Sequence, residues 1–441
     1  MMPVLEKMTG RTLESVATAE KDGVLTRQVD KPHLVWRLGT HDEKGKLLRR
    51  PYNQMMEVQE YRRRFGASPW EHVRHYATGV FEGVLAIRSE RDPTKVNILT
   101  LDENVDRLFR SMRSFSLVPP TRKGEDTEIH DAYLKNNPGE TLLKPEESVY
   151  LHTSKRTVRE GIVEIITKSL ENGLVSLEPD EKGKPRLIYI RPAAGKGEFL
   201  NKQGEIAPQI GVDSILHEVY LEVTAKNVGR YLDSGEANGI DGLPRLPKLL
   251  VYEPKGPIKG IMTPGRLTKG IDNYGEAGKA KVKAKQNGFD EALLLDPDGY
   301  VLEGGGENVY FIKDEVLITP SLKQSILPGT KRKLVLNIAR ILGIKVQERK
   351  ISLDEALEAD AMAMSGTWMG FGAVGEVYQH SKRRSAKYQR DNPLINLISL
   401  YYEEIIHDRE ITHHDQAKQN ALIELQKKIL YPINIPDRKA A

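Results

Sequence analysis

The chain has 441 residues, of which 39% are hydrophobic and 29% charged, and its 66 basic and 62 acidic side chains leave a formal net charge of +4. This balance is typical of a globular protein with enough apolar material for two domains, and it gives no support to a nucleic-acid or membrane-surface protein, because phosphate binding requires a concentrated basic face. Cysteine is absent, which excludes disulfides, thiolate metal sites and cysteine nucleophiles.

The N-terminal segment shows no targeting signal. Charged side chains interrupt residues 1–25, so this segment lacks the apolar core of a signal peptide, and residues 1–30 are predicted to form a polar arm. No stretch approaches the roughly 20 apolar residues that a membrane span requires. We therefore expect a cytoplasmic location.

Residues 31–227 are predicted to form a smaller α/β domain. The stretch 75–87, rich in small and β-forming residues, indicates a buried turn that leads into a central strand. Other strands are expected from similar composition, at 33–38, 96–100, 187–191 and 214–223. Helices are expected where apolar residues recur at helical spacing, at 102–117 and 158–170. Two charged segments, 42–70 and 119–147, are predicted to be surface insertions.

A linker at 228–240 is predicted to lead into a larger domain, 241–405, followed by a C-terminal helical extension, 406–441. The turn Asp296-Pro297-Asp298-Gly299 predicts a hairpin between strands at 291–295 and 301–302. The helix expected at 275–288 carries four lysines, which we interpret as a solvated face. Further strands and helices complete this domain, at 309–312, 316–319, 331–342, 344–348, 353–357, 361–364, 393–404 and 415–429.

The sequence motifs of several common cofactor, metal and hydrolase sites are absent from this chain. The chain has no Gly-x-Gly-x-x-Gly after a strand, no P-loop, no His-Glu-x-x-His and no Gly-x-Ser-x-Gly, so nicotinamide, nucleoside triphosphate, zinc and serine-hydrolase functions lack support, and no metal site is expected. What remains are loops suited to a small phosphate-bearing cofactor. The start of a helix at Gly329-Thr330-Lys331 offers free N–H groups, the turn Ser365-Gly366-Thr367 offers a hydroxyl, and Arg107 offers a bidentate cation. Each feature alone is more often a turn or a surface residue.

The combination of motifs is more specific. Seven of them occur in one order along residues 73–374: His75-Tyr76-x-Thr78-x-Val80-Phe81-Glu82-Gly83, Asp106-Arg107-Leu108, Tyr189-Ile190-Arg191-Pro192, Lys269-x-x-x-Asn273-Tyr274, Glu303-Gly304-x-Gly306-Glu307-Asn308, Leu327-Pro328-Gly329 and Ser365-Gly366-Thr367. In these motifs the chain resembles the class IV aminotransferases, the fold type IV pyridoxal phosphate enzymes, and most of all their branched-chain aminotransferase branch. The resemblance implies an α/β fold of the α+β type with two domains, the smaller one N-terminal, and with pyridoxal 5′-phosphate in the cleft between them.

The resemblance also implies the role of each cofactor-binding residue. Lys269 would be the catalytic residue, the Schiff-base lysine that binds the cofactor covalently and moves a proton. Glu303 would pair with the pyridine nitrogen, and Tyr274 would hydrogen-bond the phenolic oxygen. The other cofactor-binding residues are Asn308 in the motif that follows Glu303, and the phosphate ligands Arg107, Thr330, Lys331 and Thr367.

The substrate site is implied in the same way. Tyr189 and Arg191 would face the substrate, and the arginine would accept the side-chain carboxylate of glutamate. Other pocket residues would be Tyr76, Phe81, Tyr231, Thr367 and Trp368, although an ordinary core position is an equally good interpretation for Phe81 and Tyr231. The implied reaction is transamination between an apolar, branched-chain L-amino acid and 2-oxoglutarate by a ping-pong mechanism, in a homodimer.

Some positions depart from the family pattern. The family usually has Gly-Ile-Thr-Arg where this chain has Gly329-Thr330-Lys331-Arg332, and small residues where it has Trp368-Met369. Leu85 stands where an arginine is common. Two alternatives therefore stay open: another class IV enzyme, such as a D-amino acid or amine transaminase or aminodeoxychorismate lyase, and a non-catalytic binding or assembly protein on this fold.

Overall fold

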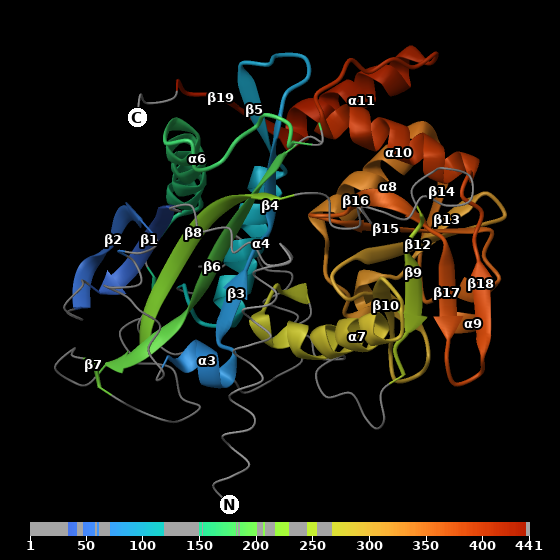
Figure 1. Ribbon diagram of the computed structural model, residues 1–441, viewed down its shortest axis with the longest axis horizontal. Coiled ribbons are helices and arrows are strands. Elements are labelled where there is room, and N and C mark those ends of the chain that lie inside the picture. Colours follow the sequence, from blue (N-terminus) through green and yellow to red (C-terminus); the bar gives the residue numbers. More distant parts are fainter. Residues whose placement is uncertain are drawn as a thin grey trace, which may run out of the picture.

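The computed structural model describes residues 34–41, 47–57, 60, 71–118, 150–151, 153–181, 183, 186–200, 206–207, 217–228, 245–253 and 267–437. Within these residues two groups of elements lie side by side (Figure 1). A large sheet and its helices come mostly from the first half of the chain, and two smaller sheets with their helices come from the second half. The structure thus has the mixed, two-part architecture predicted from the sequence.

In the described part of the chain the large sheet has nine strands, and its pairings are antiparallel. Its order is β19-β5-β4-β6-β8-β1-β2, and β3 and β7 also pair with β6. Buried and half-buried side chains alternate along most of β8, as expected where one face of a sheet packs on a core. The strands are β1 (Leu34–His41), β2 (Leu47–Glu57), β3 (Gly79–Phe81), β4 (Val84–Arg88), β5 (Lys95–Leu99), β6 (Leu187–Leu200), β7 (Ile206–Ala207), β8 (His217–Val228) and β19 (Leu430–Asn434).

In the described part of the chain, helices α4 (Leu101–Ser114) and α6 (Lys155–Glu171) pack on this sheet, and the short helix α3 (His72–Tyr76), which precedes β3, contacts β6. The apolar stripes of α4 and α6 meet the sheet in one core, where Leu108 and Ile162 are buried together with Trp36 of β1. The prediction of amphipathic helices over 102–117 and 158–170 is therefore confirmed.

The described residues of the second half of the chain form two five-stranded sheets, ordered β11-β10-β9-β17-β18 and β14-β13-β12-β15-β16. The predicted hairpin is present as β10 and β11, with Gly299 in the left-handed region of its turn. The strands are β9 (Lys248–Val251), β10 (Glu291–Leu295), β11 (Val301–Gly304), β12 (Asn308–Lys313), β13 (Val316–Thr319), β14 (Lys345–Glu348), β15 (Ala361–Gly366), β16 (Gly370–Val374), β17 (Glu376–Gln379) and β18 (Arg384–Lys387).

The helices of this half are η3 (Ile271–Asn273), α7 (Tyr274–Gln286), η4 (Leu322–Gln324), α8 (Thr330–Leu342), α9 (Leu353–Leu357), α10 (Pro393–Ile406) and α11 (Gln416–Ile429). Of these, α8, α10 and α11 pack together in one core. That core also contains Leu85, Leu187 and Tyr189 of the large sheet. The two groups of elements therefore share buried apolar residues, which fixes the relative position of the side chains that face the space between them.

The C-terminal part differs from its prediction. Residues 406–441 were predicted as a helical extension, and α11 is present, but the chain then continues as β19, which pairs with β5 at the edge of the large sheet. The helical pattern stops at Ile429 without any local signal of a strand partner from the other end of the chain. Likewise, the predicted surface insertion 42–70 contains β2, which pairs along β1.

Several predictions fall on residues outside the described ones, namely the polar arm, the insertion at 119–147 and most of the linker. The domain boundaries accordingly stay predictions. Among the described residues, none of the helices combines the length and the apolar character needed to cross a lipid bilayer.

Candidate active site

Lys269 sits where three elements meet. Its backbone N–H donates to Ser111 Oγ of α4 at 2.9 Å, and its carbonyl accepts a hydrogen bond from the Phe81 N–H of β3 at 3.1 Å. On the other side, Asn273 Nδ2 donates to the Thr268 carbonyl at 3.1 Å. These contacts fix the backbone of Lys269 between the two halves of the chain.

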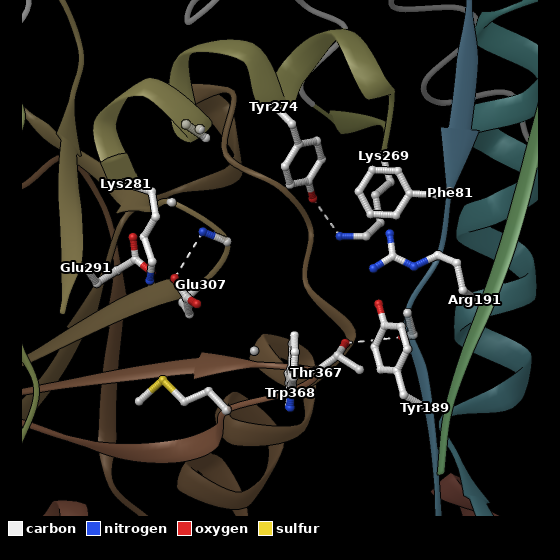
Figure 2. Close-up of a pocket in the computed structure, with 17 residues that line it drawn as sticks. Phe81, Tyr189, Arg191, Lys269, Tyr274, Lys281, Glu291, Glu307, Thr367 and Trp368 are labelled. Carbon is white, nitrogen blue, oxygen red and sulfur yellow. Dashed lines mark hydrogen bonds and ion pairs between the residues drawn. The ribbon is translucent and has the colours of Figure 1, made fainter. Parts of the chain in front are cut away.

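The Lys269 side chain points at a tyrosine and an aromatic wall. Its Nζ donates to Tyr274 Oη at 2.7 Å and lies 4.9 Å from the centre of the Phe81 ring. The rings of Phe81 and Tyr274 are 4.8 Å apart. The Arg191 guanidinium stacks on Phe81 at 4.5 Å and lies 5.1 Å from the Tyr189 ring, so that an amine and a guanidinium face the same space (Figure 2).

That space is a cavity of about 480 Å³, within the size range of small-molecule sites. The two halves of the chain both contribute to it, so its shape depends on how they pack. It is lined by Phe81, Gly83, Tyr189, Arg191, Lys269, Tyr274, Ala277, Gly278, Lys281, Glu291, Gly305, Gly306, Glu307, Gly366, Thr367, Trp368 and Met369.

Glu303 faces a smaller adjoining cavity of about 30 Å³, which shares Tyr274, Gly305 and Gly306 with the larger one. Its Oε2 accepts hydrogen bonds from the Leu327 N–H at 3.1 Å and from Asn308 Nδ2 at 3.4 Å. Asn308 Nδ2 also donates to the Leu327 carbonyl. The Glu303 carboxylate is thus held by polar contacts in a cavity next to the one that Lys269 lines.

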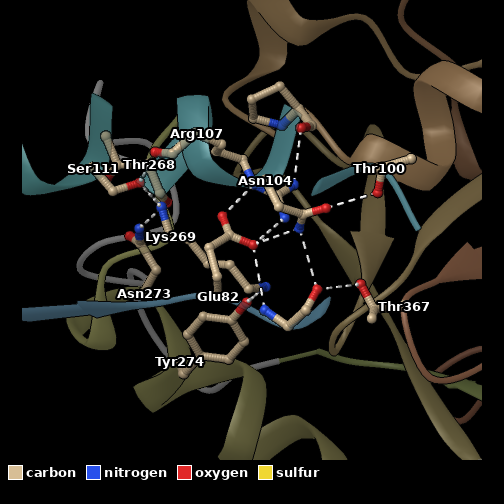
Figure 3. A network of polar contacts seen from close by, with 12 residues as sticks. Glu82, Thr100, Asn104, Arg107, Ser111, Thr268, Lys269, Asn273, Tyr274 and Thr367 are labelled. Atoms are coloured by element: carbon tan, nitrogen blue, oxygen red, sulfur yellow. Dashed lines mark hydrogen bonds and ion pairs between the residues drawn. The ribbon is translucent and has the colours of Figure 1, made fainter. Parts of the chain in front are cut away.

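Arg107 takes part in a buried network that the sequence did not predict (Figure 3). Its Nε and Nη2 donate to the two Glu82 carboxylate oxygens at 2.7 and 2.8 Å, and its Nη1 donates to the Pro328 carbonyl at 3.0 Å. Asn104 Nδ2 adds a bond to Glu82 at 2.9 Å. Burial raises the pKa of Glu82, but the attraction and hydrogen bonds of Arg107 more than offset this and the pKa is lowered. Arg107 therefore fixes the loop before α8.

Lys331, the second residue of α8, has a buried side-chain amine and is 3% exposed. Its Nζ donates to Thr100 Oγ1 at 3.1 Å, a neutral partner, and burial together with Arg107 lowers its pKa to about 7. Because a buried cation is unfavourable without an anion, this environment fits an anionic group such as a phosphate. The first N–H groups of α8 begin at Thr330, and Gly329 provides no side-chain cap for them.

The structure brings most of the predicted substrate residues together. Phe81, Tyr189, Arg191, Thr367 and Trp368 all line the large cavity, and the Tyr189 and Trp368 rings are 6.1 Å apart.

Two predicted residues are not placed there. Tyr76 lies on α3 and is not among the residues that line this cavity, and Tyr231 lies outside the described residues.

Thr367, which does line the cavity, also links its turn to the large sheet, because its Oγ1 donates to the Gly83 carbonyl at 3.3 Å.

Three charged residues of the cavity were missed as site residues from the sequence: Lys281, Glu291 and Glu307. Lys281 was interpreted as one of four solvated lysines on α7, and this was wrong, because it forms an ion pair with the buried Glu291. The sequence offered one signal, which was the position of the two glutamates near the Glu303 motif. Glu307 lies within that motif, and Glu291 is the first residue of β10, which pairs with the strand that contains Glu303.

Part of the chain that builds this site matches a known protein family. Residues 264–377 match the family model for amino-transferase class IV, a stretch that contains Lys269, Glu303, Lys331 and Thr367. Over this stretch the chain is similar to the class IV aminotransferases. Enzymes of class IV use pyridoxal 5′-phosphate, so the cofactor predicted from the sequence is confirmed at the level of the family.

Branched-chain aminotransferases of plants are among the relatives of this chain. The chloroplastic branched-chain-amino-acid aminotransferase 3 of Arabidopsis thaliana is 29% identical over 330 residues, which cover 73% of this chain and 64% of that one. Across this relative and two further plant relatives, the matched part of the chain spans 58 to 64% of the relative's length.

Two solved structures show the same fold. The branched-chain aminotransferase of Thermoproteus uzoniensis with norvaline matches with a TM-score of 0.62 at 21% identity, over 91% of this chain and 99% of that one. The branched-chain amino acid aminotransferase from Escherichia coli matches with a TM-score of 0.58 at 19% identity, over 87% of this chain and 97% of that one. The prediction of the fold type IV architecture is confirmed.

Proposed function

We propose that this chain is a pyridoxal-phosphate-dependent transaminase that moves an amino group between an apolar, branched-chain L-amino acid and 2-oxoglutarate by a ping-pong mechanism. The observation that carries the proposal is the pairing of Lys269 with Tyr274 in a cavity whose adjoining recess holds the Glu303 carboxylate. An amine at one end and a carboxylate at the other suit a planar cofactor with a carbonyl and a basic ring nitrogen.

The cofactor, when bound, supplies an electron-accepting ring. Lys269 is the amine that can attach it covalently and exchange a proton, and the Tyr274 hydroxyl orients that amine at 2.7 Å. Glu303, fixed by two hydrogen bonds, can hold a proton on the ring nitrogen.

The phosphate would be held at the start of α8. Thr330 and Lys331 offer backbone N–H groups, the buried Lys331 amine can take up a proton, and Thr367 offers a hydroxyl. Arg107 contributes by fixing the loop at Pro328, since all three of its guanidinium nitrogens donate to Glu82 or to that loop.

The substrate would lie on the Arg191 side of the cavity. Its guanidinium, stacked between Phe81 and Tyr189, can accept a side-chain carboxylate such as that of glutamate. The aromatic rings of Phe81, Tyr189 and Trp368 offer apolar surface for an aliphatic side chain and exclude water from it. One pocket can in this way accept both partners of the reaction.

The test is the visible absorbance spectrum of the purified protein with and without a panel of amino donors. We expect a bound chromophore that borohydride traps on Lys269, and a spectral change with branched-chain L-amino acids that 2-oxoglutarate reverses. Lys269→Ala should abolish trapping, whereas Lys285→Ala, at an exposed lysine of α7, should not change it.

Other outcomes would correct the proposal in defined ways. A response to D-amino acids or amines alone would indicate a different class IV transaminase, and pyruvate release from aminodeoxychorismate without amine transfer would indicate a lyase. A colourless protein with no trapped adduct would support the assembly-protein alternative.

Location and assembly are further proposals. A homodimer rests on the resemblance to class IV aminotransferases, and light scattering during size-exclusion chromatography would measure it. The cytoplasmic location stays a prediction, since a relative from Arabidopsis thaliana is chloroplastic.

A further inference from the structure

One end of the cavity carries a cluster of ionisable residues that the proposed mechanism does not use. Lys281 of α7 forms an ion pair with Glu291 of β10, and Glu307 lies beside them just before β12 (Figure 2). Glu291 is 1% exposed and Glu307 is 6% exposed. Carboxylates are rarely buried in this way without a specific role or partner.

Glu307 holds a glycine loop on both sides. Its Oε2 accepts a hydrogen bond from the Gly306 N–H at 3.0 Å, and its backbone carbonyl accepts one from the Gly304 N–H at 2.7 Å. Three consecutive glycines have no side chains to restrict them and lose much conformational entropy when they are ordered. The contacts of Glu307 therefore select one conformation of this loop.

Glu291 supports the same loop directly. A Cβ on Gly305 would lie 2.7 Å from Glu291 Oε1, so the loop backbone rests against this carboxylate. The same oxygen accepts a hydrogen bond from the Ala292 N–H at 2.9 Å, and Lys281 contacts the other oxygen. Lys281 is thus the cation that offsets the burial of the Glu291 charge.

The loop begins at the residue after Glu303, and Glu307 at its end precedes Asn308, which donates to the Glu303 carboxylate, so the conformation of the loop affects where this carboxylate lies. We propose that Lys281, Glu291 and Glu307 form a positioning triad that fixes the Gly304–Gly306 loop and thereby holds Glu303 against the ring nitrogen of the cofactor. This inference rests on the proposed function, because it assigns the triad to the site that the cofactor would occupy.

The charge state of the triad suits this role. Burial, and then the neighbouring Glu291, raise the pKa of Glu307 to about 8. The charged groups that face it are Lys281 on α7, Glu291 on β10 and Glu303 on β11. At neutral pH Glu307 is protonated and Lys281 balances Glu291, so the triad places no net charge beside Glu303.

The experiment uses the full chain and pyridoxal 5′-phosphate labelled with ¹⁵N in the ring. The ¹⁵N chemical shift reports the proton on the ring nitrogen, and an absorbance titration gives the dissociation constant. We expect Lys281→Met and Glu307→Ala to move the shift towards that of the unprotonated ring and to weaken binding by roughly tenfold. Glu307→Gln, which keeps an acceptor for the Gly306 N–H, should restore both values to within about twofold.

Lys285→Met, the same change at an exposed lysine of α7, is the matched control and should leave both values unchanged. The inference is wrong if Lys281→Met and Glu307→Ala lower the unfolding temperature of the cofactor-free protein yet keep the wild-type shift and affinity. Should these two variants fail to fold, Glu307→Asp gives the same measurement with a milder change, and a wild-type shift there contradicts the inference. A wild-type protein that binds no labelled cofactor would instead overturn the proposed function, and this inference with it.

Discussion

Lys331 shows how one residue can change the chemistry of a site that otherwise follows the class IV pattern. The class IV pattern usually has a hydroxyl residue here, whereas this chain has a buried ammonium whose pKa lies near 7 because of burial and the nearby Arg107. A bound phosphate would stabilise the charged form of Lys331. Binding at a pH above 7 therefore requires that Lys331 takes up a proton.

We accordingly expect phosphate affinity to fall as the pH rises from 7 to 9. The probe is 4-deoxypyridoxine 5′-phosphate, which has the phosphate but cannot attach to Lys269, titrated by fluorescence. The fall should approach about tenfold per pH unit in the wild type and should be much smaller in Lys331→Thr. Lys333→Met, at an exposed lysine in the same helix, should behave as the wild type. An equal slope in Lys331→Thr would contradict the assignment.

Glu307 gives a second prediction at this scale. Its pKa in the folded protein, about 8, lies above the ordinary value of 4.5, so its contribution to stability is present at low pH and is lost as the pH rises from 4.5 through 8. Glu307→Gln removes this titration. The variant should therefore lose less stability than the wild type between pH 5 and pH 8, as measured by urea unfolding at each pH. Parallel curves for the two proteins would contradict the raised pKa.

At the scale of elements, sequence periodicity predicted helices and strands well because each pattern reports a buried face. It did not predict contacts at single positions. Gly161 of α6 lies against the Trp36 ring, where a Cβ would come within 2.6 Å of the indole, whereas a Cβ on Gly278 of α7 would meet nothing within 4 Å. Both residues are glycines within helices, so the sequence alone treats them alike.

The same substitution should therefore have opposite effects at these two positions. Gly161→Ala should destabilise the protein by about 1–3 kcal/mol because the Trp36 ring is fully buried and has little room to move. Gly278→Ala should stabilise it by roughly 0.5–1 kcal/mol, because alanine restricts the unfolded chain. Chemical denaturation of the two variants measures the difference, and effects of equal sign would show that the helix packing is misassigned.

At the scale of the whole molecule, the C-terminal strand ties the end of the chain to its first half. In β19, Ile433 packs on the core of the large sheet, as does Ile435 just beyond it, while α11 packs with α8 and α10 in the other core. The C-terminal segment thus contacts both halves of the chain.

Removal of residues 430–441 should therefore lower stability by roughly 2 kcal/mol or more, which corresponds to several degrees in the unfolding temperature. It should also expose β5 as a sheet edge and promote aggregation. Removal of 438–441 alone, beyond β19, is the control and should have little effect. A full truncation that melts at the wild-type temperature would show that β19 does not contribute to the folded core.

The sequence by itself determined the resemblance to class IV aminotransferases and the main chemical groups proposed for the site, because motif residues such as Lys269, Tyr274 and Glu303 are recognised by type and spacing. It also determined which faces of α4 and β8 are buried, because periodicity is a local property.

Only the tertiary structure decided which partners those residues have. The Arg107–Glu82 pair, the Lys281–Glu291 pair beside Glu307, and the pairing of β19 with β5 all join segments that are separated along the chain. A local pattern shows that a charged residue or a strand is present. It does not show which distant group shares its burial, and burial beside a partner is what sets the charge and position of each side chain.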